Sequence, residues 1–294
     1  MKRIANVLFA IIFAVALFSC DKVDLPVSGT SDGPIITDTG VNVRKILIEE
    51  FTGLGCGFCP PAAEKAAQLQ ELYGEQIIVI ALNTGFFADP SQGNPYDEDW
   101  RTDDGNEIAG TFLGVSATYP TGMISRSSII SGSTDNLQIR HSSWSTAIER
   151  LKDIAPEISI KIDAVYNAQS NSVDISTMMI PLTNMEGEYN LALSLVENNV
   201  IGPQKYYGKD PEDIYDYVHK HVYRGNINST WGEKVIDGAV VAGDTIEVVN
   251  TNFVLNPDYN PNECLIVAYL HDKKSDEIIQ VEEVYVIEVE VEEQ

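Results

Sequence analysis

Two cysteines separated by two residues, Cys56 and Cys59, are the residues of this sequence best suited to chemistry. Thiols at this spacing can close a small disulfide ring. The pair lies between a strand-like apolar run, 46–51, and a helix-like run, 61–73. At such a junction the amide dipoles of the helix N-terminus favour a thiolate on the outer sulfur. The pattern therefore indicates thiol-disulfide chemistry.

Three further features along the chain agree with this chemistry. Glu50 stands six residues before the first cysteine, a second apolar run covers 77–82, and Tyr119 and Pro120 precede a third apolar stretch. In this order the features resemble the thioredoxin fold, in which a strand, a CxxC helix, a second strand and a cis-proline loop surround one site. A lone CxxC motif is weak evidence, but the ordered context favours a thioredoxin-like domain.

The resemblance implies a catalytic role for three residues. Cys56 is the attacking thiol, Cys59 is the buried resolving thiol, and Glu50 takes the position of the buried acid that accepts the proton of Cys59. The alternative for Glu50 is a carboxylate exposed at the end of its strand. Glu49 points to the opposite face of that strand and is therefore the control residue. Because Cys56 precedes the helix and Gly57 follows it, we expect Cys56 to be the more accessible and more acidic thiol.

The substrate side of the site is expected around a proline. The resemblance implies a cis peptide bond before Pro120, where Tyr119 would present backbone groups to a substrate, and an ordinary trans turn is the alternative. Gly57 and Phe58, between the cysteines, are the other expected substrate contacts. The glycines of this loop leave room for a partner's cysteine to approach the sulfur in line.

The stretch 84–106 is too long and polar for a plain connection, so we expect an insertion. Its four aromatic residues either form a rim that selects a partner or pack the loop onto its own domain: Phe86, Phe87, Tyr96 and Trp100. The remaining elements expected in a thioredoxin-like domain over 41–155 are a helix at 107–113, strands at 122–125 and 127–130, and a helix at 143–154.

From Pro156 onward, apolar and polar residues alternate between turn-like segments. This pattern predicts an all-β, immunoglobulin-like sandwich over 156–294. Its expected strands are 158–165, 173–181, 189–196, 244–254, 265–270 and 278–289. The stretch 210–231 is expected to be irregular. Its His219 and His221 have a spacing that suits a metal, but no ligand cluster accompanies them, so we expect neither a metal nor a cofactor.

The N-terminus carries an export signal, expected as a signal peptide over 1–19. Two basic residues precede a short apolar run that ends at Cys20, in a pattern that resembles a bacterial lipobox. Lipidation of Cys20 would attach the protein to a membrane, and the segment 20–40, rich in glycine, proline and serine, indicates a flexible tether. Ordinary signal cleavage that leaves a free thiol is the alternative.

The overall composition excludes one class of partner. Acidic residues outnumber basic ones 44 to 19, and such a surface cannot replace the counterions of a phosphate backbone, so no nucleic-acid partner is expected. Four cysteines are too few for a disulfide scaffold. The fourth, Cys264, opens an expected strand and is predicted to be a buried, small apolar residue.

Several motifs together resemble the outer membrane protein 28-related lipoproteins of Gram-negative bacteria. They are the lipobox, the Cys-Gly-Phe-Cys motif with prolines after it, a Tyr-Pro-Thr-Gly segment ending at Arg126, and the run Tyr-Val-His-x-His-Val-x-Arg. The resemblance implies a lipid-anchored protein of the outer membrane, facing the periplasm or the cell surface. It also implies a surface adhesin or receptor role.

Two functions therefore compete. The first is a thiol-disulfide oxidoreductase that acts on the thiols and disulfides of exported proteins. The second is a binding or adhesion lipoprotein in which the disulfide between Cys56 and Cys59 only locks a turn. A third possibility, a structural zinc site, would need ligands that the sequence does not supply.

Overall fold

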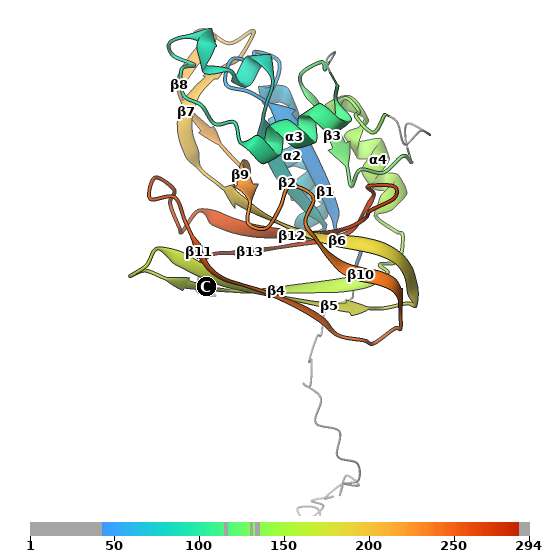
Figure 1. Cartoon of the computed structure of the whole chain (residues 1–294). Coiled ribbons are helices and arrows are strands. Elements are labelled where there is room, and N and C mark those ends of the chain that lie inside the picture. The colour runs from blue at the N-terminus through green and yellow to red at the C-terminus, as the bar shows by residue number, and fades with distance from the viewer. Residues whose placement is uncertain (1–42, 115–116, 130–131, 133–135, 288–294) are drawn as a thin grey trace, which may run out of the picture. The chain divides into compact units, whose positions relative to one another are not determined.

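A mixed sheet of eight strands runs through most of the chain in the computed structural model (Figure 1). The structure describes residues 43–287, except 115–116, 130–131 and 133–135. The strand order is β13-β12-β6-β9-β2-β1-β3, and β10 pairs with β6 outside this path. The bounds of these strands are β1 Ile46–Thr52, β2 Ile77–Asn83, β3 Thr121–Ile124, β6 Met185–Glu197, β9 Val222–Asn226, β10 Glu233–Val240, β12 Cys264–Asp272 and β13 Ile278–Tyr285.

Strands β1 and β2 are parallel, and helix α2, Pro60–Tyr73, connects them. The helix begins with two prolines, which fit the first turn because its amides have no partner within the helix. It ends at Gly74, whose φ of 59° suits a residue without a side chain. The predicted strand, helix and strand are therefore confirmed.

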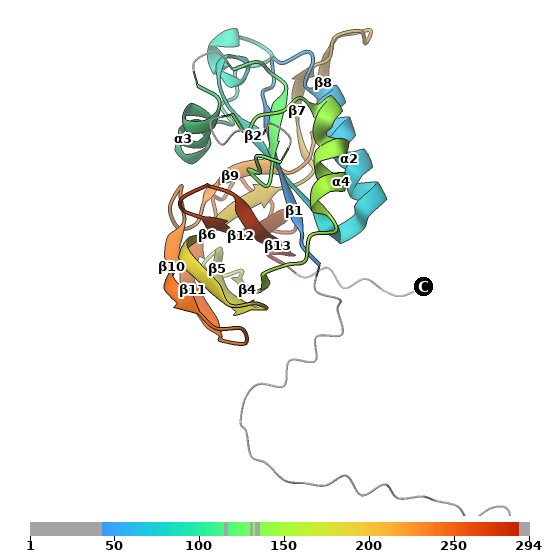
Figure 2. The same cartoon turned by 90° about the vertical axis from the view of Figure 1, so that its right-hand side faces the viewer.

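Helices cover both faces of β1 and β2. Figure 2 shows α2 and α4, Trp144–Leu151, side by side on one face, and α3, Asp103–Phe112, on the other. Ile48 packs among the residues of α2 and α4, whereas Leu47 packs among those of α3. Burial on both faces explains why these strands are continuous apolar runs rather than alternating ones. The predicted closing helix is confirmed.

The aromatic residues of the insertion at 84–106 are only partly in solvent. The insertion contains two short 3₁₀ helices, Phe86–Ala88 and Pro90–Gln92. Tyr96 and Trp100 are buried in a small apolar cluster with Leu54, Val200 and Val222, so this part of the loop packs mainly against residues beyond 155 rather than onto the predicted domain 41–155. Phe86 is the exception, with 68 % of its surface exposed.

The strand expected at 127–130 is wrong over its described residues. Ser125 and Arg126 have φ values of 47° and 46°, so the chain turns away immediately after β3. Arg126 is then almost fully buried instead of lying on a strand surface. The described residues that follow this turn, 127–129, are not in a strand.

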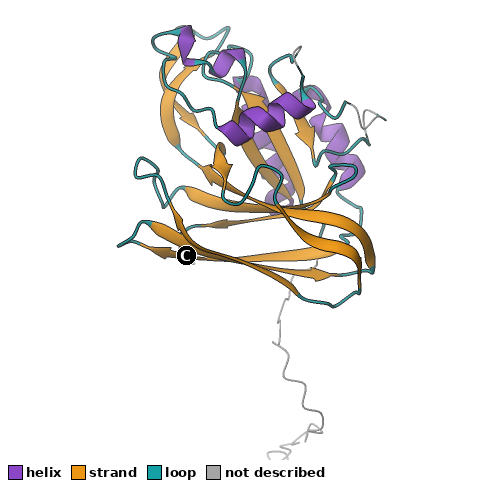
Figure 3. Cartoon of the chain, viewed as in Figure 1, coloured by secondary structure: helices purple, strands orange, loops and turns teal. Residues whose placement is uncertain are grey.

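The second half of the chain is rich in β-strands, as predicted, whereas the immunoglobulin-like arrangement stays a prediction. Three antiparallel strands form a separate sheet: β4 Ile158–Asn167, β5 Ser172–Pro181 and β11 Ile246–Val254. Their apolar side chains, including Ile160 and Val173, pack in one core with Leu193 and Ile266 of the large sheet. Figure 3 shows the two layers of strands, and it shows how few helices the described chain contains.

The expectation of an irregular stretch at 210–231 is wrong. Strand β8, Asp213–His219, pairs with β7, Val200–Lys205, in a two-stranded sheet of its own, which we call the β7–β8 hairpin. His221, with a φ of 56°, then turns the chain into β9. Strand β10 was also not expected. The sequence pattern missed these strands because none shows a long apolar alternation.

Strand β9 joins the two parts of the chain. It pairs with β6 on one side and, through Val222 and Ala81, with β2 on the other. The predicted boundary between 155 and 156 falls between α4 and β4, yet the sheet is continuous across it, and 41–294 forms one compact unit. Independent folding of 41–155 and 156–294 stays a prediction.

The export signal, the lipidation site at Cys20 and the tether to residue 40 lie outside the described residues. Among the residues that are described, no helix has the length and apolar character to cross a bilayer.

Candidate functional site

Cys56 and Cys59 form a disulfide at the point where the chain leaves β1 and enters α2. A tight turn holds the pair, with the amide of Cys59 donating to the carbonyl of Cys56 at 3.1 Å. Both cysteines are buried, with 2 % and 1 % of their surface exposed. In this disulfide state neither sulfur is accessible, so the greater accessibility and acidity expected of the Cys56 thiol stay a prediction for the reduced protein.

The β7–β8 hairpin is what covers the disulfide. The amide of Tyr207, just beyond β7, donates to the carbonyl of Gly57 at 2.9 Å. A Cβ atom on Gly57 would lie 2.5 Å from the Tyr207 ring, so this position requires glycine. Phe58 lies at the outer edge of the contact, with 65 % of its surface exposed and its ring 4.9 Å from that of Tyr207.

Glu50 is a buried acid without an ion pair among the described residues. It lies on β1, paired in register with Ala81 of β2 and Gly122 of β3, and only 2 % of its surface is exposed. Its Oε1 atom has no hydrogen-bond partner. Burial raises the pKa of Glu50 to about 8, so the carboxyl is mainly protonated at neutral pH. The predicted burial is confirmed.

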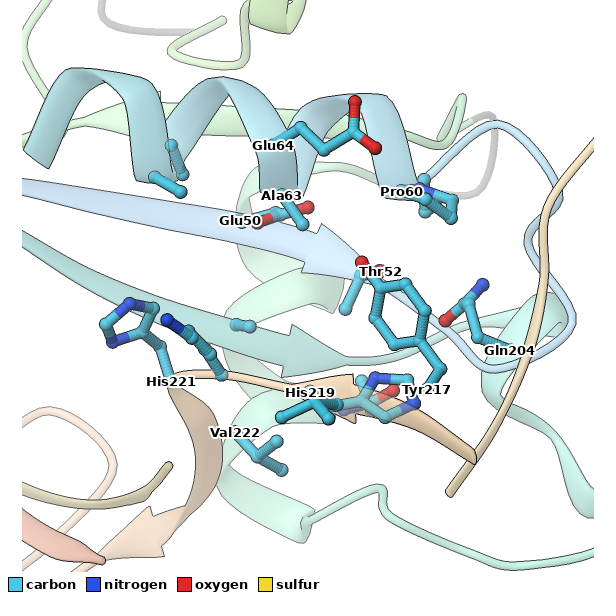
Figure 4. A pocket seen from close by; sticks show the side chains of 17 residues that line it. Glu50, Thr52, Pro60, Ala63, Glu64, Gln204, Tyr217, His219, His221 and Val222 are labelled. Carbon is cyan, nitrogen blue, oxygen red and sulfur yellow. The ribbon is translucent and has the colours of Figure 1, made fainter. Parts of the chain in front are cut away.

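A cavity of about 190 Å³ joins Glu50 and Cys59 to residues from the end of β8 and the start of β9. Figure 4 shows Glu50 on the side of β1 and α2, with Tyr217, His219 and His221 on the opposite side. The cavity is also lined by Thr52, Pro60, Ala63, Asn83, Gln204 and Val222. One wall therefore comes from the predicted redox site, and the other comes from a segment about 150 residues later in the chain.

The two histidines on this cavity are neutral at pH 7. Burial lowers the pKa of His219 to about 4 and that of His221 to about 4. The Nε2 atom of His219 and the Nδ1 atom of His221 are buried without a hydrogen-bond partner. Buried polar atoms of this kind are costly unless water or a bound group satisfies them. The cavity thus gathers three unsatisfied polar atoms, including the one on Glu50.

Pro120 lies at the same end of the sheet as the disulfide. The Tyr119-Pro120 peptide bond is cis, and β3 begins directly after it and runs antiparallel to β1. The start of β3 therefore lies beside the end of β1. Tyr119 packs edge-on against Phe87 with ring centroids 6.1 Å apart, and the carbonyl of Phe87 accepts from the amide of Gly55 at 2.9 Å. These contacts link the proline loop to the loop before the cysteines.

Glu49 is not the neutral control that the sequence suggested. It does lie on the opposite face of β1 from Glu50, but it is fully buried and paired with Arg126. The Nε and NH2 atoms of Arg126 donate to its carboxylate at 2.9 and 2.7 Å. The guanidinium also lies over the rings of Phe112, Trp231 and Tyr269. A change at Glu49 would leave this buried cation unpaired.

Two other chemical possibilities are limited by the structure. In the described part of the chain, no three His, Cys, Asp or Glu side chains lie close enough to hold a metal ion. Cys264 is completely buried, and burial raises the pKa of its thiol to about 12. It is an unreactive core residue, as predicted.

Sequence reasoning missed the residues that the hairpin brings to the site, above all Gln204, Tyr207 and Tyr217. A signal was present, because two short runs flank the turn-forming segment 208–211, which contains glycine, aspartate and proline. Such a pattern indicates a β-hairpin. Nothing in the pattern indicates that this hairpin lies on the cysteines.

A comparison with protein families matches residues 114–290 to the model described as outer membrane protein Omp28. A comparison with curated protein sequences finds no match.

Two solved structures share the fold at low sequence identity, and a third matches over a smaller part of the chain. HBP35 of Porphyromonas gingivalis is 18 % identical with a TM-score of 0.62, and the match covers 87 % of this chain and 80 % of that one. An Agrobacterium tumefaciens protein is 12 % identical with a TM-score of 0.51, over 87 % of this chain and all of the other. A domain of the outer membrane lipoprotein Omp28 from Porphyromonas gingivalis is 17 % identical over 45 % of this chain and 88 % of its own, with a TM-score of 0.29.

Proposed function

The chain belongs to the family of outer membrane protein Omp28, which places it at the outer membrane, and we propose that it is a thiol-disulfide oxidoreductase there. Its partners are the cysteines of exported proteins. Cys20 carries the lipid that holds the protein on the membrane. The proposal includes the thioredoxin-like interpretation of β1, α2, β2 and β3.

The observation that carries the proposal is the buried, unpaired carboxyl of Glu50 on the same cavity as Cys59. A buried acid without a counterion is costly to a fold, and perturbed carboxyls of this kind concentrate at functional sites. A pKa of about 8 lets Glu50 change its protonation state near neutral pH. A disulfide that only locked a turn would gain nothing from such a neighbour.

In the oxidising direction, a partner thiolate attacks the Sγ atom of Cys56. A partner–Cys56 disulfide forms, the Cys56–Cys59 bond breaks, and its electron pair goes to the sulfur of Cys59. The protonated carboxyl of Glu50 gives its proton to that sulfur. The reverse sequence resolves a mixed disulfide: Glu50 takes the proton of Cys59, Cys59 attacks Cys56, and the partner leaves as a thiolate.

The cavity provides the remaining requirement, an exchange of the Glu50 proton with water. Glu50 is too buried to meet bulk solvent directly. The unsatisfied nitrogens of His219 and His221 can accept hydrogen bonds from water in the cavity. Water held there would connect Glu50 to the surface while leaving both imidazoles neutral.

The substrate contacts are part of the same proposal. Pro120 shapes a peptide groove at the end of the sheet, with Tyr119 and Gly57 offering backbone groups to the partner. Phe58 offers an exposed aromatic ring beside the disulfide.

A specific observation favours the second candidate, a binding or adhesion lipoprotein. Both cysteines are buried under the β7–β8 hairpin, as expected of a disulfide that stabilises a turn. In that case the sandwich carries the binding surface, and the disulfide never exchanges.

Insulin reduction in the presence of dithiothreitol separates the two candidates. Wild type should accelerate it, Cys56→Ser should not, and Cys264→Ser should match wild type because that thiol is buried and apart from the site. A wild-type protein that does not accelerate the reaction would leave the binding role as the function.

A further inference from the structure

The β7–β8 hairpin holds a position that a substrate of the proposed reaction would need. We propose that Gln204 and Tyr207 are specificity-determining residues, which keep the hairpin on Cys56 so that an extended polypeptide can displace it and a folded protein surface cannot. This inference rests on the proposed function and names the substrate class of the same site: cysteines in unfolded segments of exported proteins.

The hairpin occupies backbone acceptors of the cysteine loop, from Leu54, just before the cysteines, to Gly57, which lies between them. The amides of Lys205 and Tyr207, two residues apart, donate to the carbonyls of Leu54 and Gly57, both at 2.9 Å. The side chain of Gln204, only 3 % exposed, adds a hydrogen bond of 3.1 Å to the carbonyl of Cys56. The hairpin therefore contacts this loop as a short extended segment would.

This contact blocks the reaction geometry. A thiolate must approach the Sγ atom of Cys56 in line with the bond to Cys59, but only 2 % of the surface of Cys56 is exposed. The ring of Tyr207 already lies so close to Gly57 that a single added carbon there would meet it at 2.5 Å. The hairpin has to move before a partner reaches the sulfur.

The hairpin can move without breaking a larger sheet, although Tyr96 and Trp100 contact its strands. Its two strands pair only with each other, and among the described strands none continues them into a larger sheet. Isolated two-stranded sheets are marginally stable, and such elements open more readily than a sheet core. Apolar side chains on it remain exposed, including Ile201 and Tyr215, with 69 % and 66 % of their surface in solvent.

The backbone groups that become free when the hairpin moves away indicate which substrates can bind. Once the hairpin leaves, the carbonyls of Leu54 and Gly57 lose their donors. The backbone amides of an extended chain can replace them, as in other cases of strand-like peptide binding. The exposed ring of Phe58 lies beside this position and can contact an apolar residue near the partner cysteine. A cysteine on a folded surface cannot present its own backbone in this way.

The test measures how fast the Cys56–Cys59 disulfide is reduced by three thiols: dithiothreitol, an unfolded peptide with one cysteine, and a folded protein with one surface cysteine. Tyr207→Ala and Gln204→Ala each remove one contact between the β7–β8 hairpin and the cysteine loop. The loss of one such contact raises the fraction of molecules in which the hairpin has left the loop by about tenfold. Both variants should react with dithiothreitol about tenfold faster than wild type. Their preference for the unfolded peptide over the folded protein should fall by at least about tenfold.

The control is Tyr215→Ala, the same substitution at an exposed position on the same hairpin, which should keep wild-type rates. Amide hydrogen exchange provides a second readout. The Tyr207 amide should exchange much faster than that of Leu193 in the sheet core, and faster still in Gln204→Ala. Wild-type rates and preference in both hairpin variants, or a Tyr207 amide as protected as the sheet core, would overturn the proposal.

The outcomes separate this inference from the proposed function. Faster disulfide reduction in the variants, together with no insulin reduction by wild type, would support the covering role of the β7–β8 hairpin and contradict the oxidoreductase function. Insulin reduction by wild type, together with unchanged rates in the variants, would support the oxidoreductase function and contradict the covering role of the hairpin.

Discussion

Strand β1 carries two neighbouring glutamates on opposite faces, and only one of them has an ion-pair partner among the described residues. On the α3 face, Glu49 is fully buried, and Arg126 donates to both of its oxygens. On the α2 face, Glu50 is almost as buried, but no salt bridge involves it among the described residues, and its Oε1 atom has no partner. Two residues of the same type, adjacent in sequence, therefore have opposite surroundings: one is paired with a buried cation, and the other has no ion-pair partner in the described part of the chain.

The comparison indicates that Glu49 stabilises the fold, whereas Glu50 is available for proton transfer. A close cation favours the charged form of a carboxylate, whereas burial without a cation raises the pKa of a carboxyl and favours its neutral form. The Glu49–Arg126 pair ties β1 to the turn after β3. Glu50 lies beside the cavity that the hairpin closes. The following predictions test this division, from the largest expected effect to the smallest.

Glu50→Gln should slow resolution of the mixed disulfide by a factor of about a hundred to ten thousand, the range for one positioned acid or base. Attack by the reduced Cys56 thiolate on a substrate disulfide should change little, because Cys59 neither gains nor loses a proton in that step. Single-turnover kinetics with a trapped mixed disulfide measure the two steps separately. Glu71→Gln, an exposed carboxylate on α2, is the matched control. Equal resolution rates in all three proteins would remove the role of Glu50.

Glu49→Gln should destabilise the fold by about 3–5 kcal/mol, because it leaves the buried guanidinium of Arg126 uncompensated. Urea unfolding followed by circular dichroism measures this loss. The rate of resolution per folded molecule should stay within a few-fold of wild type. A loss of activity without a loss of stability would mean that the two faces are not separate.

Protonation of Glu50 should make the free energy of unfolding of the protein decrease as pH rises. Its pKa rises from an ordinary 4.5 to about 8 on folding, so the folded state binds the proton more tightly, and between these values stability falls as pH rises. The slope is about 1.4 kcal/mol per pH unit at most. The free energies of unfolding of wild type and Glu50→Gln, compared from pH 6.5 to 8, isolate this effect. A constant difference between them would show that Glu50 is ionised in the fold.

His219 and His221 should act in the opposite sense at lower pH. Burial lowers their pKa values from 6.5 to about 4, so the unfolded chain binds more protons there, and stability rises with pH between these values. Each histidine contributes at most about 1.4 kcal/mol per pH unit. His219→Gln should flatten the unfolding free energy between pH 4.5 and 6.5, and an unchanged slope would contradict the burial of its imidazole.

Replacing the whole ion pair should have the smallest effect. The double substitution Glu49→Leu with Arg126→Met should recover most of the stability that Glu49→Gln loses, to within about 1–2 kcal/mol of wild type, because an apolar replacement leaves no charge to solvate. Urea unfolding of the double variant beside Glu49→Leu and Arg126→Met gives the coupling directly. A double variant as unstable as either single one would mean that the pair does more than neutralise charge.

Several parts of the fold follow from short-range sequence signals. The apolar runs of β1 and β2, the helix formers of α2 and the glycine that ends it are all local, and the structure agrees with each. The alternation of side chains along a strand also put Glu49 and Glu50 on opposite faces correctly. The spacing of apolar residues and the residues that end a helix can be read from the sequence because both depend only on neighbours a few residues away.

Other parts follow only from contacts across long stretches of chain. Arg126, the partner of Glu49, is 77 residues away, and no local pattern identifies it. Strand β9 touches β2 through Val222 and Ala81, a pairing with no repeat to reveal it. The two-domain expectation overlooked this link because the change in pattern at Pro156 is local and the sheet is not.

The disulfide itself shows the same limit most clearly. The spacing of Cys56 and Cys59 by itself predicted that they can close a ring, because three residues of chain hold the two sulfurs close together. Their exposure depends instead on Gln204, whose side chain reaches the carbonyl of Cys56 from 148 residues away. A ring of a few residues is set by covalent geometry, whereas the cover over it is set by how distant segments pack, and that is a property of the tertiary structure alone.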